Sequence, residues 1–238
     1  MRLKFFRVVS WHGEIAPIEH SGLIWAGIGG ELPVAPVLPA NTPILRALEL
    51  PSIYALTNAT ENGIDAELEK MERALGEGLR LIQVRDKTLP TTQRRRLATQ
   101  VMSLAKKYTD ARVLINDDEA LAREVQAHGL HLSSGRLMQL TERPTFDWVA
   151  ASCHTTDELS RAAALGIDFA VLSPVLPTQS HPDAEIIGWD EFARLTERAP
   201  LPVFALGGMS PGMLETARGR GAHGVALMRA WAQIARSV

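Results

Sequence analysis

The chain has 238 residues, of which 46% are hydrophobic, and its formal net charge at pH 7 is -2. This length allows one sizeable hydrophobic core, and the absence of a broad basic field argues against a nucleic-acid partner. Cys153 is the single cysteine, no uncharged run reaches the ~18 to 20 residues of a membrane helix, and no export signal is recognisable, so we expect a cytoplasmic protein without a membrane partner.

The chain divides near residue 50. Residues 21–43 are rich in glycine and proline, and no regular alternation of strand and helix precedes Leu50. Beyond this point, short β-branched or apolar runs predict eight strands. They span residues 52–57, 79–84, 111–115, 129–132, 148–152, 169–172, 202–206 and 224–228. We therefore expect two units, residues 1–49 and residues 50–238.

Apolar residues between the predicted strands recur at helical spacing. The clearest groups are Leu68, Met71 and Leu75, then Leu97, Val101, Leu104 and Tyr108, and then Trp189, Phe192 and Leu195. Strands that alternate with helices in this way predict an α/β fold, a closed parallel (β/α)8 TIM barrel with short loops. An open, doubly wound sheet is the alternative, but residues 56–60 lack the glycines that usually follow its first strand.

The second predicted strand ends in a cluster of polar and charged residues. Gln83, Arg85 and Lys87 are spaced two residues apart, so on a strand they project from the same face. Two neighbouring cations repel each other and lose hydration when buried, unless an anion neutralises them. The pattern therefore predicts a phosphate or pyrophosphate site, at the end of the barrel where function is expected.

The other predicted strands also end in polar residues, which include Asn116, Asp117, Ser152, His154, residues 173–181 and Arg229. After the seventh strand, Gly207 and Gly208 precede Ser210 and Pro211, and we expect Ser210 to cap a helix that begins at Pro211. Free backbone N–H groups at such a turn can bind an anion, and the nearby Arg229 favours a phosphate. The alternative is that the glycines only permit a tight turn.

Six motifs follow one another between residues 50 and 238. They are Gln83-Val-Arg-Asp-Lys87, Ile115-Asn-Asp117, Ala151-Ser-Cys-His154, Pro177-Thr-Gln-Ser180, Leu206-Gly-Gly208 and Gly221-Ala-His-Gly-Val225. In this order they resemble thiamine-phosphate synthase and its relative, the thiazole tautomerase. The synthase of that family joins an aminopyrimidine diphosphate to a thiazole phosphate and releases pyrophosphate.

The resemblance implies a role for each matching residue. Arg85, Lys87, Ser152, His154 and His181 would act in catalysis, and Asp117 would bind Mg²⁺. Substrate contacts would come from Gln83, Asp86, Asn116, Thr178, Gln179, Ser180, Gly207, Gly208, Met228 and Arg229. The implied partners are the two small-molecule phosphates, and a homo-oligomer is an option.

Some positions depart from the family pattern. Arg136 stands where the synthase usually has a second Mg²⁺-binding aspartate, and His181 stands where it has a lysine. The tautomerase has its general acid/base histidine where this chain has Pro174, so His154 or His181 would have to replace it. Three interpretations stay open: the synthase, an isomerase that acts on a thiazole phosphate without Mg²⁺, and a catalytically degenerate module that binds a phosphate ligand. His131 is either a satisfied interior histidine or a catalytic one.

The first 49 residues resemble a different family. Residues 5–14, Trp25 and residues 38–47, with Asn41 at a base-binding position, look like the carboxyl end of a Nudix hydrolase that acts on oxidised dGTP. The glutamate-rich, metal-binding Nudix box is absent, so we expect no Nudix hydrolysis from this chain. We expect a partial Nudix segment that is either poorly ordered or docked on the barrel, with the rest of a Nudix domain in the full-length protein.

Overall fold

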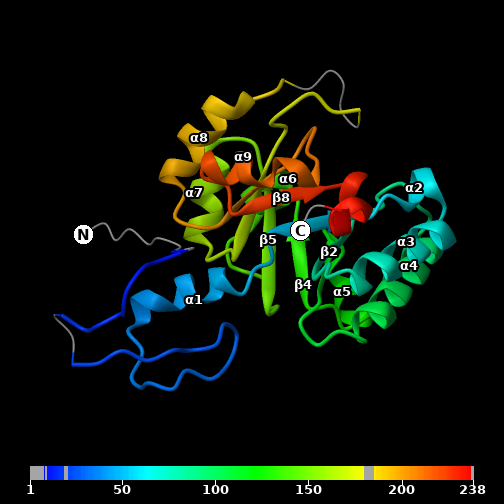
Figure 1. The fold of residues 1–238 in the computed structure, drawn as a ribbon. Coiled ribbons are helices and arrows are strands. Elements are labelled where there is room, and N and C mark those ends of the chain that lie inside the picture. The colour runs from blue at the N-terminus through cyan, green and yellow to red at the C-terminus, as the bar shows by residue number, and fades with distance from the viewer. Residues whose placement is uncertain (1–7, 9, 19–20, 180–184, 237–238) are drawn as a thin grey trace.

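The computed structural model describes residues 8, 10–18, 21–179 and 185–236. Eight parallel strands pair in chain order, and β8 pairs with β1 through Ile53 and Val225, so the sheet closes into a barrel (Figure 1). The strands are β1 Ile53–Leu56, β2 Leu81–Val84, β3 Arg112–Asn116, β4 Gly129–Leu132, β5 Trp148–Cys153, β6 Phe169–Leu172, β7 Val203–Ala205 and β8 Gly224–Leu227. The predicted (β/α)8 barrel is confirmed, and the pairing of β1 with β8 excludes the open sheet.

Helices surround the strands, with α3, α4 and α5 on one side and α7, α8 and α9 on the other (Figure 1). The α-helices are α1 Thr42–Leu48, α2 Ala59–Asn62, α3 Ile64–Gly76, α4 Thr91–Ala105, α5 Glu119–Glu124, α6 Ser134–Gln139, α7 Thr156–Ala164, α8 Gly188–Arg198 and α9 Leu214–Gly219. The described residues also form the 3-10 helices η1 Pro39–Asn41, η2 Pro211–Met213 and η3 Ala230–Arg236. The three predicted groups of helical spacing fall in α3, α4 and α8, except that Tyr108 lies beyond the end of α4.

Alternating residues of the strands form two separate hydrophobic clusters. The outward residues, such as Ile82, pack against the helices. The inward residues fill the barrel, where Tyr54 lies against the rings of Phe169 and Phe204 at centroid distances of 5.2 and 5.9 Å. The same period of two brings Gln83, His131 and Ser152 to the inner face near the carboxyl ends of their strands.

The segment before the barrel contacts it through α1, at the amino-terminal end of the strands. The guanidinium of Arg46 lies 3.4 Å from the ring centroid of Trp148, the first residue of β5, and its Nε donates to Asp168 at 3.3 Å. Between residues 10 and 38, by contrast, large apolar side chains are exposed in the described ranges, for example Ile18 (95%) and Trp25 (78%). Among the described helices, none has the length and apolar character to cross a bilayer.

Candidate active site

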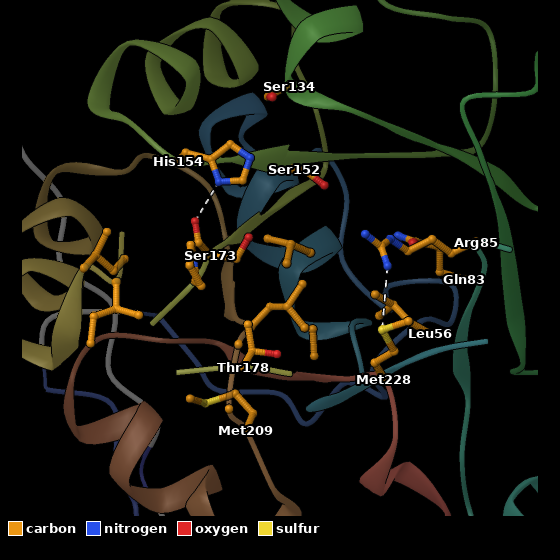
Figure 2. Close-up of a pocket in the computed structure, with 18 of the residues that line it drawn as sticks. Leu56, Gln83, Arg85, Ser134, Ser152, His154, Ser173, Thr178, Met209 and Met228 are labelled. Carbon is orange, nitrogen blue, oxygen red and sulfur yellow. Dashed lines mark hydrogen bonds between the residues drawn. The ribbon is translucent and has the colours of Figure 1, made fainter. Parts of the chain in front are cut away.

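A cavity of about 1290 Å³ opens at the carboxyl ends of the strands. Figure 2 shows Gln83 and Arg85 on one side of it, and His154, Ser173 and Thr178 on the other. The predicted site residues that line it are Gln83, Arg85, Lys87, Ser152, His154, Thr178, Gln179, Gly207, Gly208, Met228 and Arg229. The fold therefore brings together most of the side chains that the sequence predicted to meet. Ser180 and His181 lie outside the described residues.

Arg85 and Lys87 give the cavity a positive wall. Arg85 is partly buried, and the loss of hydration lowers the pKa of its guanidinium, an effect that Asp86 opposes. Its Nη1 lies 3.7 Å from the sulfur of Met228. Within the described part of the chain, neither Arg85 nor Lys87 forms an ion pair. A bound anion could therefore pair with both cations.

Asp86 does not line this cavity. Its carboxylate accepts hydrogen bonds from the Thr57 hydroxyl at 2.5 Å and from the backbone N–H of Thr60 at 2.9 Å. Thr57 Oγ1 in turn accepts the backbone N–H of Arg85 at 3.0 Å. The alternation of side chains along the chain explains the difference from the prediction, because Asp86 points away from the face shared by its two neighbours. Asp86 ties the loop after β2 to the loop after β1, and its direct contact with a substrate stays a prediction.

Four inward side chains form a hydrogen-bonded chain, which we call the floor network: Gln83, Tyr54, His131 and Ser152. Gln83 Nε2 donates to the Tyr54 hydroxyl at 3.1 Å, and this hydroxyl lies 3.1 Å from His131 Nδ1. His131 Nε2 lies 2.9 Å from Ser152 Oγ. Burial, followed by the charges of Arg85 and Lys87, lowers the pKa of His131 to about 3, so its imidazole is neutral. Burial raises the pKa of the Tyr54 phenol, which keeps its proton.

A glycine turn follows β7, a strand that does not pair with β2, and forms another wall of the cavity. Gly207 and Gly208 have φ angles of +99° and +68°, and a Cβ on Gly208 would lie 2.7 Å from the backbone oxygen of Pro177. The turn therefore packs against the loop that carries Thr178 and Gln179. A helix begins at Pro211 with Ser210 at its N-cap position, as predicted, but the Ser210 side chain makes no capping hydrogen bond. The helix is a 3-10 turn, in which the Met213 N–H donates to the Ser210 backbone oxygen at 3.0 Å.

Arg229 lines the cavity at the end of β8, as predicted, but it also has a protein partner. Its guanidinium donates to both carboxylate oxygens of Glu61 in α2, with Nε at 3.1 Å from Oε2. This contact lowers the pKa of Glu61. A phosphate at Arg229 would share the guanidinium with Glu61.

His154 lies on the loop that begins α7. The loop is fixed by a capping box, in which Thr155 Oγ1 accepts the Glu158 N–H and the Glu158 carboxylate accepts the Thr155 N–H. The backbone oxygen of Ser173 can only accept, so His154 Nδ1 donates to it at 2.6 Å (Figure 2).

Comparison with known proteins identifies the family. Residues 53–231 match the model of the family described as thiamine monophosphate synthase. The chain belongs to the thiamine monophosphate synthase family. The sequence resemblance over residues 50–238 is confirmed by this match, which does not extend to the proposed Nudix segment.

Two relatives within the family are matched over most of their length. The chain is 35% identical over 182 residues to a putative thiamine-phosphate synthase 2 of Aquifex aeolicus, covering 75% of this chain and 96% of the relative. It is 34% identical over 183 residues to a putative thiamine-phosphate synthase of Geobacter sulfurreducens, covering 75% and 85%. Among solved structures, thiamine phosphate pyrophosphorylase from Pyrococcus furiosus superposes with a TM-score of 0.66 at 25% identity, covering 81% of this chain and 93% of that one.

The Mg²⁺ that the family implies would lie in a second cavity of about 540 Å³, which shares Arg85 and Lys87 with the first and is lined by Asn116, Asp117 and Arg136. Asp117 Oδ1 accepts the Ser133 N–H at 2.7 Å, and Asn116 Nδ2 lies 3.4 Å from Oδ2. Arg136 donates to the backbone oxygen of Asp117 and, at 3.1 Å, to Glu119.

These donors do not form a complete metal site. Among the described residues, no group of three or more His, Cys, Asp or Glu side chains is placed to hold a metal ion. Mg²⁺ is usually held by one or two carboxylates together with substrate phosphates and water. The residues present therefore fit an ion that Asp117 and a bound diphosphate hold together, and they do not fit an ion held by protein alone.

Sequence reasoning missed Tyr54 as a site residue and left the role of His131 open. The signal for Tyr54 was present, because the period of two from Leu56 back along the first predicted strand puts the phenol on the inner face. Its hydroxyl group then needs a partner inside the barrel. Which partner it finds depends on strands that are far away in the sequence.

Proposed function

We propose that this protein joins an aminopyrimidine diphosphate to a thiazole phosphate and releases pyrophosphate, which makes it a thiamine-phosphate synthase. One observation supports this most directly: Gln83 Oε1 is buried and has no hydrogen-bond partner among the described residues, directly before the unpaired cations Arg85 and Lys87. An unsatisfied buried acceptor costs about 1–3 kcal/mol. A substrate with a ring-bound amino group and a diphosphate satisfies the acceptor and both cations together.

The chemistry needs charge stabilisation more than a protein nucleophile. The bond between the pyrimidine methylene carbon and the diphosphate oxygen breaks, the oxygen keeps the electron pair, and the thiazole nitrogen forms the new bond to that carbon. Arg85 and Lys87 stabilise the negative charge that develops on the leaving diphosphate. Cys153 takes no part, because it is buried on the outer face of β5 and burial raises its pKa to about 12.

Mg²⁺ would supply further positive charge at the diphosphate when bound. Asp117 would be its protein carboxylate, and Asn116, the last residue of β3, would orient that carboxylate. Arg136 occupies the neighbouring position as a fixed cation paired with Glu119, so it can neither ligate the metal nor move away without breaking that ion pair. We therefore propose a Mg²⁺ site that is completed only by substrate.

The thiazole phosphate would bind at the opposite wall. The Gly207–Gly208 turn, Thr178 and Gln179 line the cavity together with Arg229 and Met228, and the sulfur of Met228 lies beside Arg85. The predicted contacts of Ser180 and His181 belong to the same proposal. Figure 2 shows Thr178 across the cavity from Gln83 and Arg85, an arrangement that suits two anionic substrates that meet through their uncharged rings.

Conversion of the two substrates to thiamine phosphate and pyrophosphate in the presence of Mg²⁺ tests this proposal. Arg85→Ala or Lys87→Ala should lower kcat/KM by about 10²- to 10³-fold, as expected when a group that stabilises transition-state charge is lost. Arg96→Ala is the control, because Arg96 lies on the exposed side of α4 and pairs with Asp65. Binding of thiazole phosphate by calorimetry without any turnover would instead identify a binding module.

A second candidate function is isomerisation of a thiazole phosphate by proton transfer. The contact between His154 and Ser173 favours it, because a neutral imidazole that donates from Nδ1 is left with Nε2 as a base. Loss of proton exchange on the thiazole ring in His154→Ala, with synthase turnover unchanged, would support this candidate.

We further propose that residues 1–49 are the carboxyl-terminal part of a Nudix domain and that the enzyme works in the cytoplasm. The sequence resemblance and the exposed Ile18 and Trp25 support the first statement. The biosynthetic chemistry of the family supports the second. Neither affects the assignment of the barrel residues.

A further inference from the structure

The hydroxyl of Ser152 lies within hydrogen-bond distance of the imidazole of His131, and the hydrogen bond can run in either direction. The two directions give Ser152 different chemical roles. If Nε2 carries a lone pair, His131 is a base that activates Ser152 as a nucleophile. If Nε2 carries the proton, Ser152 accepts it and keeps its own hydrogen for a ligand. The remaining members of the floor network, Tyr54 and Gln83, decide between these arrangements.

Tyr54 has one hydrogen to donate, and its oxygen already accepts the N–H of Gln83 at 3.1 Å. The acceptor within reach of that hydrogen is His131 Nδ1, also at 3.1 Å. A ring nitrogen that accepts a hydrogen bond carries no proton, so the proton of the imidazole must be on Nε2. His131 Nε2–H consequently donates to Ser152 Oγ at 2.9 Å.

The opposite orientation of the Gln83 amide would reverse every proton in the floor network. Tyr54 would then donate to Oε1, His131 Nδ1–H would donate to Tyr54, and Ser152 would donate to Nε2. That arrangement leaves the amide N–H groups of Gln83 without a partner, whereas the observed one leaves only Oε1 unpaired. Buried N–H groups without a partner are rarer than unpaired carbonyl oxygens, so the observed orientation is favoured.

We propose that Tyr54 and His131 are positioning residues, which hold Ser152 as a hydrogen-bond donor to a phosphoryl oxygen in the cavity and prevent it from acting as a nucleophile. Ser152, Arg85 and Lys87 line the same cavity, so one anion bound there can contact all three side chains. The inference rests on the proposed function for the identity of this anion, the diphosphate. The direction of the hydrogen bonds is inferred independently of the proposed function.

The direction is tested without any ligand. The ¹⁵N chemical shifts of the imidazole distinguish a nitrogen that carries a proton from one that carries a lone pair, and comparison with His131→Gln assigns the signals. We expect a proton on Nε2 and a lone pair on Nδ1 of His131 in the 238-residue protein. A proton on Nδ1 would overturn the proposal and restore Ser152 as a nucleophile paired with a base.

The consequence for binding is tested with inorganic pyrophosphate by calorimetry at a fixed Mg²⁺ concentration. Ser152→Ala should weaken binding about tenfold, the effect of losing a hydrogen bond to a charged group. Tyr54→Phe should also weaken pyrophosphate binding. The double variant should bind pyrophosphate no more weakly than Ser152→Ala does, because both substitutions remove the same interaction. Phe204→Leu alters the aromatic packing around Tyr54 without touching a hydrogen bond, and it should leave the affinity unchanged.

Two results would contradict the proposal: additive losses in the double variant, or a loss in Phe204→Leu as large as that in Tyr54→Phe. The first would mean that Tyr54 acts independently of Ser152. The second would mean that Tyr54 matters only for packing. If the wild-type protein did not bind pyrophosphate, the proposed function would fail, while the ring tautomer would still decide the direction of the hydrogen bonds.

Discussion

At the residue scale, the buried imidazole of His131 connects the active site to the stability of the barrel. It has 1% of its surface exposed and a pKa of about 3, far below its ordinary value of 6.5. At a pH between these two pKa values, the imidazole binds a proton in the unfolded chain but not in the folded protein. The contribution of His131 to stability is therefore complete above pH 6.5 and is lost progressively as the pH falls toward 3.

His131→Gln should make stability less dependent on pH. Between pH ~7.5 and ~5.5 the wild-type protein should lose about 1.4 kcal/mol of unfolding free energy through this group alone, and the variant should lack this share of the loss. Urea unfolding of both proteins at the two pH values measures the difference. Equal losses in both proteins would mean that His131 is protonated in the folded state.

At Gly208, the backbone conformation restricts which residues the turn proposed to bind the thiazole phosphate can contain. In Gly208→Ala, strain at a positive φ and the clash with Pro177 should cost about 1 to 3 kcal/mol and weaken the binding of thiazole phosphate. Gly212→Ala, four residues later, is a matched control because a Cβ there meets no atom within 4 Å. Thermal unfolding and calorimetry check both variants. Similar effects in both would show that the turn does not depend on this glycine.

At the element scale, α1 joins the segment before the barrel to the end opposite the active site. Two guanidinium groups contact the ring of Trp148, with Arg46 of α1 at 3.4 Å and Arg112 of β3 at 4.8 Å from its centroid. Arg112 also donates to Glu49 at 3.0 Å. These contacts hold α1 on the barrel without any hydrophobic core of its own, since none of its residues is fully buried.

Arg46→Ala should loosen α1 and leave the chemistry intact. The stacking on Trp148 and the partly exposed ion pair with Asp168 together contribute about 1 kcal/mol. We expect faster hydrogen exchange in residues 42–50 and an unchanged kcat/KM for synthesis, because the cavity lies at the other end of the strands. Arg46→Lys keeps the charge but loses most of the stacking and should give a smaller change. A large loss of activity in Arg46→Ala would show that α1 influences the site.

At the scale of the whole molecule, closure of the barrel creates the site. Tyr54, Gln83, His131 and Ser152 come from β1, β2, β4 and β5, so no part of the chain can form the floor network by itself. A ligand that contacts several strands binds only the closed barrel. Its binding free energy should therefore add to the free energy of global unfolding.

Pyrophosphate with Mg²⁺, at about 100 times its Kd, should raise the unfolding free energy by about 2.7 kcal/mol. The rise should disappear at the same concentration in Arg85→Ala, which weakens binding. Urea titrations with and without the ligand measure it. Binding in calorimetry without a shift of the unfolding midpoint would mean that the anion also binds a partly unfolded barrel.

The sequence by itself determined the features that depend on local periodicity. Alternation along the chain placed Gln83, Arg85 and Lys87 on one face, the spacing of Met71 and Leu75 predicted α3, and the order of strands and helices predicted the barrel. The family followed from short motifs for the same reason, since each motif lies within one strand end.

Only the tertiary structure decided which side chains pair across the barrel. His131 bonds to Tyr54 and Ser152, which are 77 and 21 residues away, and Arg229 bonds to Glu61 across 168 residues. These contacts depend on the register between strands and on the paths of the loops, which the packing of distant segments fixes. The direction in which a side chain points is a local property, whereas the partner that it meets is a property of the closed barrel.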